Sequence, residues 1–179
     1  RAFAASLPEK YSKPVFINDE ACDYITDNQD DSFILYVNFL EPHMPFFGPR
    51  DSQYNLEDIP LPPNFDHENM DKQSIRTRYL REKQKQQGMS GLPLANEKDW
   101  KRMIANYWGL VSLVDSCVGR LIDTLERCGL YDDTIIVFTS DHGDMMGSQH
   151  LIAKGVMFEE AVKVPLLLKI PGIEKDGVI

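Results

Sequence analysis

Three short apolar runs stand out along the chain, separated by polar or amphipathic segments. They cover residues 33–39 (FILYVNF), 134–138 (TIIVF) and 164–170 (VPLLLKI). Near-continuous runs of β-branched, aliphatic and aromatic residues are typical of strands that are buried on both faces, as in a parallel sheet. The pattern therefore predicts three strands that belong to the interior of one sheet.

The segments between these runs predict helices. Asn96 is suited to the N-cap of a long helix, apolar residues then recur at steps of three and four from Met103 to Leu125, and Gly129 suits the C-terminal cap. Shorter helices are predicted at 19–27 and 156–161. Helical crossovers between apolar strands indicate an α/β fold with a mainly parallel sheet, whose ligands bind beyond the carboxyl ends of the strands.

Two segments do not fit this alternation. Residues 41–65 are rich in proline and aromatic residues, which predicts a long ordered loop, and such loops are often functional. Residues 67–87 are polar and contain Arg76, Arg78 and Arg81. This second pattern favours a solvated helix or flexible excursion, with a basic rim that holds an anionic substrate as the alternative.

Composition narrows the range of partners. The chain has 179 residues and a formal net charge of −9, which argues against nucleic acid or an anionic membrane as a partner. No apolar stretch approaches the roughly 20 residues needed to span a bilayer. Cys117 and Cys128 fall on one predicted helix about 16 Å apart, too far for a disulfide. With Cys22 they are expected to be reduced thiols.

The strongest candidate for chemistry follows the second apolar run. Asp141 and His142 precede Gly143 at the carboxyl end of a predicted strand, and a carboxylate with an imidazole can bind a metal ion. Taken alone, the three residues are more typical of a turn with a capping aspartate. By the same standard, Lys154 alone is typical of a surface lysine and His43 of a loop histidine bonded to backbone.

The surrounding sequence resembles the sulfatase family of the alkaline-phosphatase-like superfamily. The likeness is carried by residues 141–172 (DHGDMMGSQHLIAKGVMFEEAVKVPLLLKIPG), by 41–46 (EPHMPF) and 60–65 (PLPPNF), and by the helix 107–122. It covers almost the whole chain in the family's order. The resemblance implies an alkaline-phosphatase-like fold, of which this chain would be a partial three-layer α/β/α sandwich with a mainly parallel sheet.

The resemblance also implies roles for individual residues. Asp141 and His142 match metal ligands, Lys154 matches the lysine that contacts the sulfate and leaving oxygen, and His43 matches the histidine that binds the ester and protonates the departing alcohol. His150, in the same stretch, is a further substrate-binding candidate. A metal and an ammonium can stabilise the negative charge of sulfate-ester hydrolysis, and an imidazole can deliver the proton.

The cofactors implied are a divalent metal and a formylglycine nucleophile. Ca²⁺ is the first expectation, with Zn²⁺ or Mn²⁺ as alternatives because His142 offers a nitrogen ligand. The family's C/S-x-P/A-S-R nucleophile motif does not occur in the chain. Asp132 and Asp133 do not replace the family's first metal-binding pair, because they precede the strand that Asp141 follows and lie roughly 20 Å away.

These observations predict that residues 1–179 form a single fragment of a sulfatase catalytic domain, without the N-terminal nucleophile half and the C-terminal subdomain. The fragment alone is expected to be inactive and, through exposed strand edges, able to self-associate. The function expected of the full-length protein is hydrolysis of sulfate esters. A phosphonate monoester or phosphodiester hydrolase and a non-catalytic scaffold are the alternatives. The family resemblance implies a periplasmic, secreted or lysosomal protein.

Overall fold

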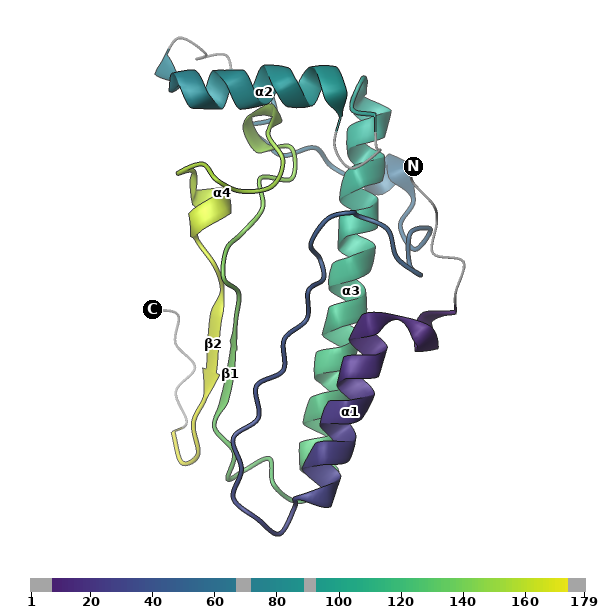
Figure 1. Ribbon diagram of the computed structural model, residues 1–179, viewed down its shortest axis with the longest axis vertical. Helices are drawn as coiled ribbons and strands as arrows, with labels where there is room; N and C mark the ends of the chain where they lie inside the picture. Colours follow the sequence, from purple (N-terminus) through teal and green to yellow (C-terminus); the bar gives the residue numbers. More distant parts are fainter. Residues whose placement is uncertain (1–7, 67–71, 89–92, 174–179) are drawn as a thin grey trace.

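The computed structural model describes residues 8–66, 72–88 and 93–173. Its longest element is helix α3, Glu97–Arg127, against which the other parts of the chain are arranged (Figure 1). Asn96 caps its start by accepting a hydrogen bond from the amide of Asp99, and Gly129 follows its end with a positive φ of 69°. Both caps and the buried apolar stripe confirm the predicted helix.

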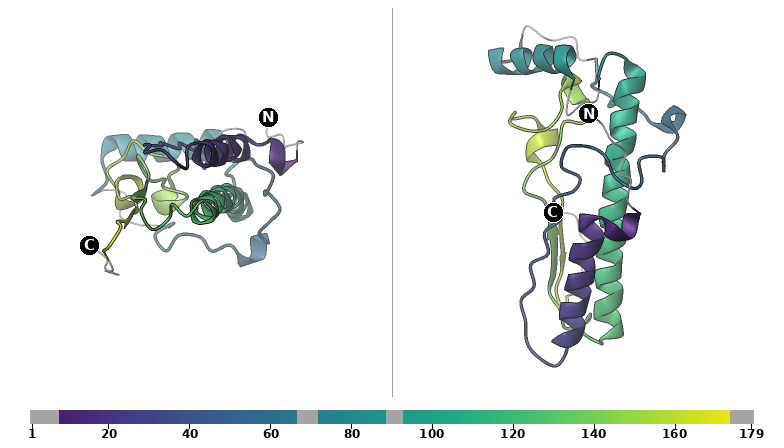
Figure 2. Two further views of the ribbon diagram at one scale, coloured as in Figure 1. Left: turned by 90° about the horizontal axis from the view of Figure 1, so that it is seen from below. Right: turned by 45° about the vertical axis from the view of Figure 1, so that its right-hand side comes forward.

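Helix α1, Lys13–Asp27, packs along α3 (Figures 1 and 2). It begins six residues before the predicted segment, with Pro14 in its first turn, where a missing amide donor costs nothing. A small core joins the two helices, in which Val15 of α1 contacts Leu113 and Cys117 of α3. The three cysteines are free thiols, as predicted.

The larger core lies near the start of α3. The proline-rich segment 41–65 forms the predicted ordered loop, with one short 3-10 helix, η2, at Leu56–Asp58. It buries Phe46, Ile59 and Phe65 against apolar residues of α3. The loop is therefore held in place by side chains of its own that enter the core, and it positions whatever polar groups it carries.

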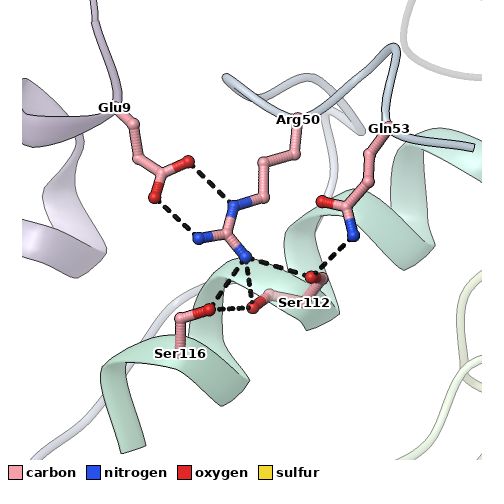
Figure 3. A network of polar contacts seen from close by, with 5 residues as sticks. All are labelled: Glu9, Arg50, Gln53, Ser112 and Ser116. Carbon is pink, nitrogen blue, oxygen red and sulfur yellow. Dashed lines mark hydrogen bonds and ion pairs between the residues drawn. The ribbon is translucent and has the colours of Figure 1, made fainter. Parts of the chain in front are cut away.

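An arginine ties this loop to the helices (Figure 3). Arg50 donates two hydrogen bonds to the carboxylate of Glu9, at 2.8 and 2.7 Å, from the 3-10 helix η1 at Glu9–Tyr11. Its remaining nitrogen donates to the carbonyl and hydroxyl of Ser112 and to the hydroxyl of Ser116 on α3. The guanidinium thus links the N-terminal region, the loop and α3 through a single side chain.

The two strands correct the predicted sheet. β1, Ile136–Thr139, and β2, Leu166–Lys169, correspond to the second and third apolar runs, but they pair antiparallel rather than parallel. A parallel pair needs a crossover that returns the chain to the start of the first strand. The helix between them, α4 at Glu159–Val162, has only four residues.

The chain between the strands folds back on itself instead. The amides of Gly143, Met145 and Gly147 donate to the carbonyls of Ala161, Ala153 and Leu151, each at 2.9 Å. These bonds join the outgoing arm of the segment 140–165 to its returning arm, so the chain re-enters the sheet at the end where it left. We call this segment the folded-back loop.

The first apolar run, 33–39, is extended but is not a strand, which corrects the second part of the sheet prediction. Its alternate side chains pack inward: Phe33 meets the ring of Tyr24 edge-on and Phe39 contacts the α1–α3 core. On the opposite side, Ile34 and Tyr36 are 97% and 86% exposed. Strand pairing requires a neighbouring backbone, and the described residues provide none along this segment.

Helix α2, Ile75–Gln87, lies across the tip of the folded-back loop (Figure 1). Ser74 caps it, and the side-chain amide of Gln84 both donates to the carbonyl of Ile152 and accepts from its amide. This confirms a helix within 67–87, of which residues 67–71 lie outside the described part. Among the described helices, none is both long and apolar enough to cross a bilayer.

Candidate functional site

Asp141 and His142 follow β1 directly, at the base of the folded-back loop. The Nδ1 atom of His142 lies 2.8 Å from the carbonyl oxygen of Gly143. A carbonyl only accepts hydrogen bonds, so Nδ1 carries the proton and Nε2 keeps its lone pair in the neutral ring. That Nε2 lies 3.5 Å from Oδ2 of Asp141.

This geometry fits two ligands of one cation. Bonds of about 2.0–2.6 Å from a carboxylate oxygen and an imidazole nitrogen to a shared ion place the two donor atoms roughly 3–3.5 Å apart. Within the described ranges, no group of three or more His, Cys, Asp or Glu side chains could hold a metal. Asp141 and His142 thus offer two donors, and a complete coordination shell needs further ones.

Asp132 and Asp133 stand apart from these residues, as the sequence predicts. They precede β1, where the carbonyl of Asp132 accepts a hydrogen bond from the amine of Lys169 at 3.0 Å. Asp141 follows the opposite end of the same strand. The two acidic positions cannot serve one ion.

Asp144 lies at the centre of the folded-back loop. Its Oδ1 accepts hydrogen bonds from the amides of Met146 at 3.0 Å and Ala153 at 2.9 Å. Burial raises the pKa of Asp144, an effect opposed by these two bonds and by the nearby charges of Lys154 and His142. The charges of a predicted metal ligand, His142, and of the predicted substrate-binding lysine, Lys154, therefore both act on this carboxylate.

Tyr107 of α3 belongs to the same neighbourhood. Burial, with a contribution from the charge of Asp144, raises the pKa of Tyr107 to about 12. The sequence alone does not identify Tyr107 or Asp144 as a functional residue. In the sequence, Asp144 is marked only by its position two residues after His142 and directly before two methionines, which is weak evidence by itself.

The predicted proton donor reaches this region through its loop. His43 is exposed, and its Nδ1 donates to the carbonyl of Met44 at 2.8 Å. Three residues later, Phe46 is buried edge-on against Tyr107 at 5.7 Å between ring centroids, and its carbonyl accepts from Asn106 at 2.9 Å. The structure thus places Asp144, two residues after His142, against the amide of Ala153, directly before Lys154, whereas the loop of His43 packs against Tyr107 through Phe46.

His150 occupies a different environment. Its ring lies 3.9 Å from the ring of Phe65, between centroids, and its Nδ1 is 2.6 Å from the carbonyl of Phe65. Trp100 meets it edge-on, and Arg81 approaches Nδ1 to 3.1 Å. Burial lowers the pKa of His150, which favours the neutral ring. These contacts anchor the tip of the folded-back loop, and a role in substrate binding stays a prediction.

Solved structures define the fold class. The chain is similar to a phosphonate monoester hydrolase from Silicibacter pomeroyi, with a TM-score of 0.84 and 25% identity over 96% of this chain and 35% of that one. It is also similar to the phosphonate monoester hydrolase of Agrobacterium radiobacter, with a TM-score of 0.72 and 26% identity over 94% and 35%. These likenesses place it among the hydrolase folds of the alkaline phosphatase superfamily.

Within that superfamily, the profile of the Sulfatase family matches residues 8–179, and the chain belongs to this family. It is 31% identical to a multifunctional alkaline phosphatase superfamily protein of Trinickia caryophylli, over 93% of this chain and 34% of the relative. It is 34% identical to a choline-sulfatase of Rhizobium meliloti, over 82% and 29%. The chain thus spans about a third of the length of these relatives.

Proposed function

We propose that the chain is the C-terminal portion of a catalytic domain that hydrolyses sulfate esters with the help of a divalent metal ion. The observation that carries this proposal is the pairing of Asp141 Oδ2 with His142 Nε2 at 3.5 Å, on the same loop as Lys154 and next to the same buried carboxylate. Two metal donors beside a cation form a site that suits a substrate with a negatively charged group.

Each side chain has a defined task in this proposal. Asp141 and His142 hold the metal ion, which when bound supplies positive charge to the sulfuryl oxygens. The ammonium of Lys154 stabilises the charge that develops on the leaving oxygen. His43 in its imidazolium form donates the Nε2 proton to the departing alcohol, while the hydrogen bond from Nδ1 to Met44 fixes the ring.

The donor set is compatible with Ca²⁺, Zn²⁺ or Mn²⁺. Ca²⁺ is the first candidate for this family, yet it binds oxygen ligands almost entirely, whereas the nitrogen of His142 suits Zn²⁺ or Mn²⁺ as well. The nucleophile, a formylglycine in the family, is proposed to lie in a part of the protein outside residues 1–179.

The distribution of apolar side chains supports a larger catalytic domain. Several exposed ones lie on the extended segment 33–40, on β1 and on β2, and these include Ile34, Tyr36, Val137 and Leu167. A sheet surface of this kind is normally covered, and when exposed it promotes association. We propose that another part of the same polypeptide covers it, and that residues 1–179 alone self-associate.

Phosphonate monoesters are the second candidate substrates. The likeness to the Silicibacter hydrolase, with its TM-score of 0.84, favours this alternative, because the fold of a relative with that activity is reproduced over 96% of the chain. Both reactions transfer a tetrahedral anionic group, so the residues described above could serve either one.

The test is an assay of the full-length protein on 4-nitrophenyl sulfate and 4-nitrophenyl phenylphosphonate, after chelation and after return of Ca²⁺, Zn²⁺ or Mn²⁺. We expect metal-dependent sulfate release that falls at least about a hundredfold in Lys154→Ala. Lys163→Ala, at an exposed lysine on the returning arm, is the matched control and should retain activity. Turnover of the phosphonate without the sulfate would select the second candidate. No metal-dependent turnover of either substrate would favour a non-catalytic scaffold.

A further inference from the structure

The folded-back loop holds an unusual concentration of backbone strain. Met146, Gln149, His150 and Ala153 have positive φ angles of 38°, 58°, 56° and 63°, a conformation that side chains with a Cβ atom rarely adopt. Each such residue costs on the order of 1–3 kcal/mol unless its surroundings hold it. The loop therefore needs groups that keep its backbone in this shape.

Asp144 is placed to do this. A single oxygen, Oδ1, accepts hydrogen bonds from the amides of Met146 and Ala153, which are two of the four strained residues and lie on opposite arms of the loop. Hydrogen bonds from backbone amides to a carboxylate are stronger than those between neutral groups. One side chain thus fixes both arms at the same point.

The backbone conformation of Ala153 determines the direction in which the chain continues at Lys154. Lys154 lies between Ala153, with φ of 63°, and Gly155, with φ of 89°, so two left-handed residues flank the lysine. Gly155 tolerates this conformation without a Cβ, whereas Ala153 depends on its hydrogen bonds. A change at Asp144 would therefore release the backbone directly before Lys154.

We propose that Asp144 is the positioning residue for Lys154. It holds the backbone of Ala153, the residue directly before Lys154, and so fixes the point of the loop from which the lysine side chain extends. This inference rests on the catalytic role proposed for Lys154 and adds a residue that acts through it. Asp144 itself does not contact the substrate.

Two substitutions separate the backbone contact from the charge. Asp144→Asn keeps a carbonyl oxygen that can accept from both amides, whereas Asp144→Ala removes the acceptor. Because a misplacement of about 1 Å can cost roughly a hundredfold in rate, we expect kcat to fall about 30- to 100-fold in D144A with less than about a threefold change in KM. D144N should recover kcat to within about fivefold of the wild type.

A double-mutant cycle with Lys154→Ala tests whether Asp144 acts through the lysine. If it does, adding D144A to K154A should lower kcat by less than about threefold, because there is no longer an ammonium to misplace. Thermal unfolding of each variant identifies any that do not fold. Should D144A fail to fold, the comparison is made with D144N alone and with D144N combined with K154A.

The inference is wrong if D144A lowers kcat equally in the wild-type and K154A backgrounds, since that result indicates a general structural defect. It is also wrong if a folded D144N is as slow as D144A, because then the charge and not the backbone contact matters. Failure of the proposed function has another signature, in which the wild-type protein is inactive or K154A retains full kcat.

Discussion

The substitution Gly143→Ala tests the geometry of the folded-back loop at its narrowest point. Gly143 follows His142, and its amide donates to the carbonyl of Ala161 on the returning arm at 2.9 Å. A Cβ built on Gly143 would lie 3.1 Å from the carbonyl carbon of Glu160 and 3.6 Å from Cα of Ala161, and closer still to the oxygen of Glu160. The obstacle is backbone on the opposite arm, which cannot rotate away as a side chain would.

The size of the effect follows from these contacts. Relieving the overlap requires the two arms to separate, which costs about 1–3 kcal/mol of the kind seen when a packed site is overfilled. Loss of the hydrogen bond from Gly143 to Ala161 adds about 1 kcal/mol. The sum is about 2–4 kcal/mol, which for a chain of this size lowers Tm by about 4–16 °C. Because His142 is adjacent, metal affinity should fall as well.

The assay is thermal unfolding followed by circular dichroism, together with calorimetric titration of the metal into the full-length protein. The matched control is Gly119→Ala on α3, where an added Cβ meets no atom within 4 Å. In a helix interior this control should be neutral or stabilising by up to about 1 kcal/mol. An alanine at Gly143 that leaves both Tm and metal affinity at wild-type values would refute the close approach of the two arms.

Three further predictions concern the scaffold around the site. Phe46 belongs to the same loop as His43 and is fully buried. Phe46→Ala should therefore lower the free energy of unfolding by about 3–5 kcal/mol, measured by urea denaturation. Because the loop also carries His43, kcat should fall as well. The hydrogen bonds from Arg50 lower the pKa of Glu9 from its usual 4.5. The ion pair therefore contributes to stability above pH 4.5, and this contribution is lost as the pH falls through the lower pKa of Glu9 in the folded state. In Glu9→Gln, the dependence of Tm on pH below about 4.5 should be shallower. The guanidinium of Arg76 on α2 lies 3.5 Å from the position that a Cβ would occupy at Gly155, the residue after Lys154. Arg76→Ala should therefore raise KM for an anionic substrate several-fold, and by less at high salt. Arg78→Ala on the same helix is the control, and equal effects of the two substitutions would contradict a specific role of Arg76 in a basic rim that holds the substrate.

The features predicted well from the sequence are those that local chemistry determines. Helix α3 could be located because Asn96 and Gly129 mark its ends and its apolar residues recur with helical spacing. The turn with Asp141 and His142 could be located because it follows an apolar run. In these cases the residues that decide the structure are neighbours in the sequence.

The features predicted wrongly depend on contacts that no local pattern encodes. The antiparallel pairing of β1 and β2 follows from hydrogen bonds between the arms of the folded-back loop, such as that from Met145 to Ala153. The segment 33–39 has the composition of a strand, but among the described residues it has no partner backbone. An isolated aspartate such as Asp144 has no sequence signature, and only the structure shows that its Oδ1 bridges the amides of Met146 and Ala153.

The most direct test of the proposed site is a crystal structure of the full-length protein with a divalent metal ion and an unreactive sulfamate analogue of a sulfate ester. We predict that Asp141 Oδ2 and His142 Nε2 both coordinate the metal at about 2.0–2.6 Å, and that the amine of Lys154 lies within about 3 Å of an oxygen of the analogue. A metal ion bound elsewhere, or an amine of Lys154 directed away from an analogue bound at Asp141 and His142, would contradict the account.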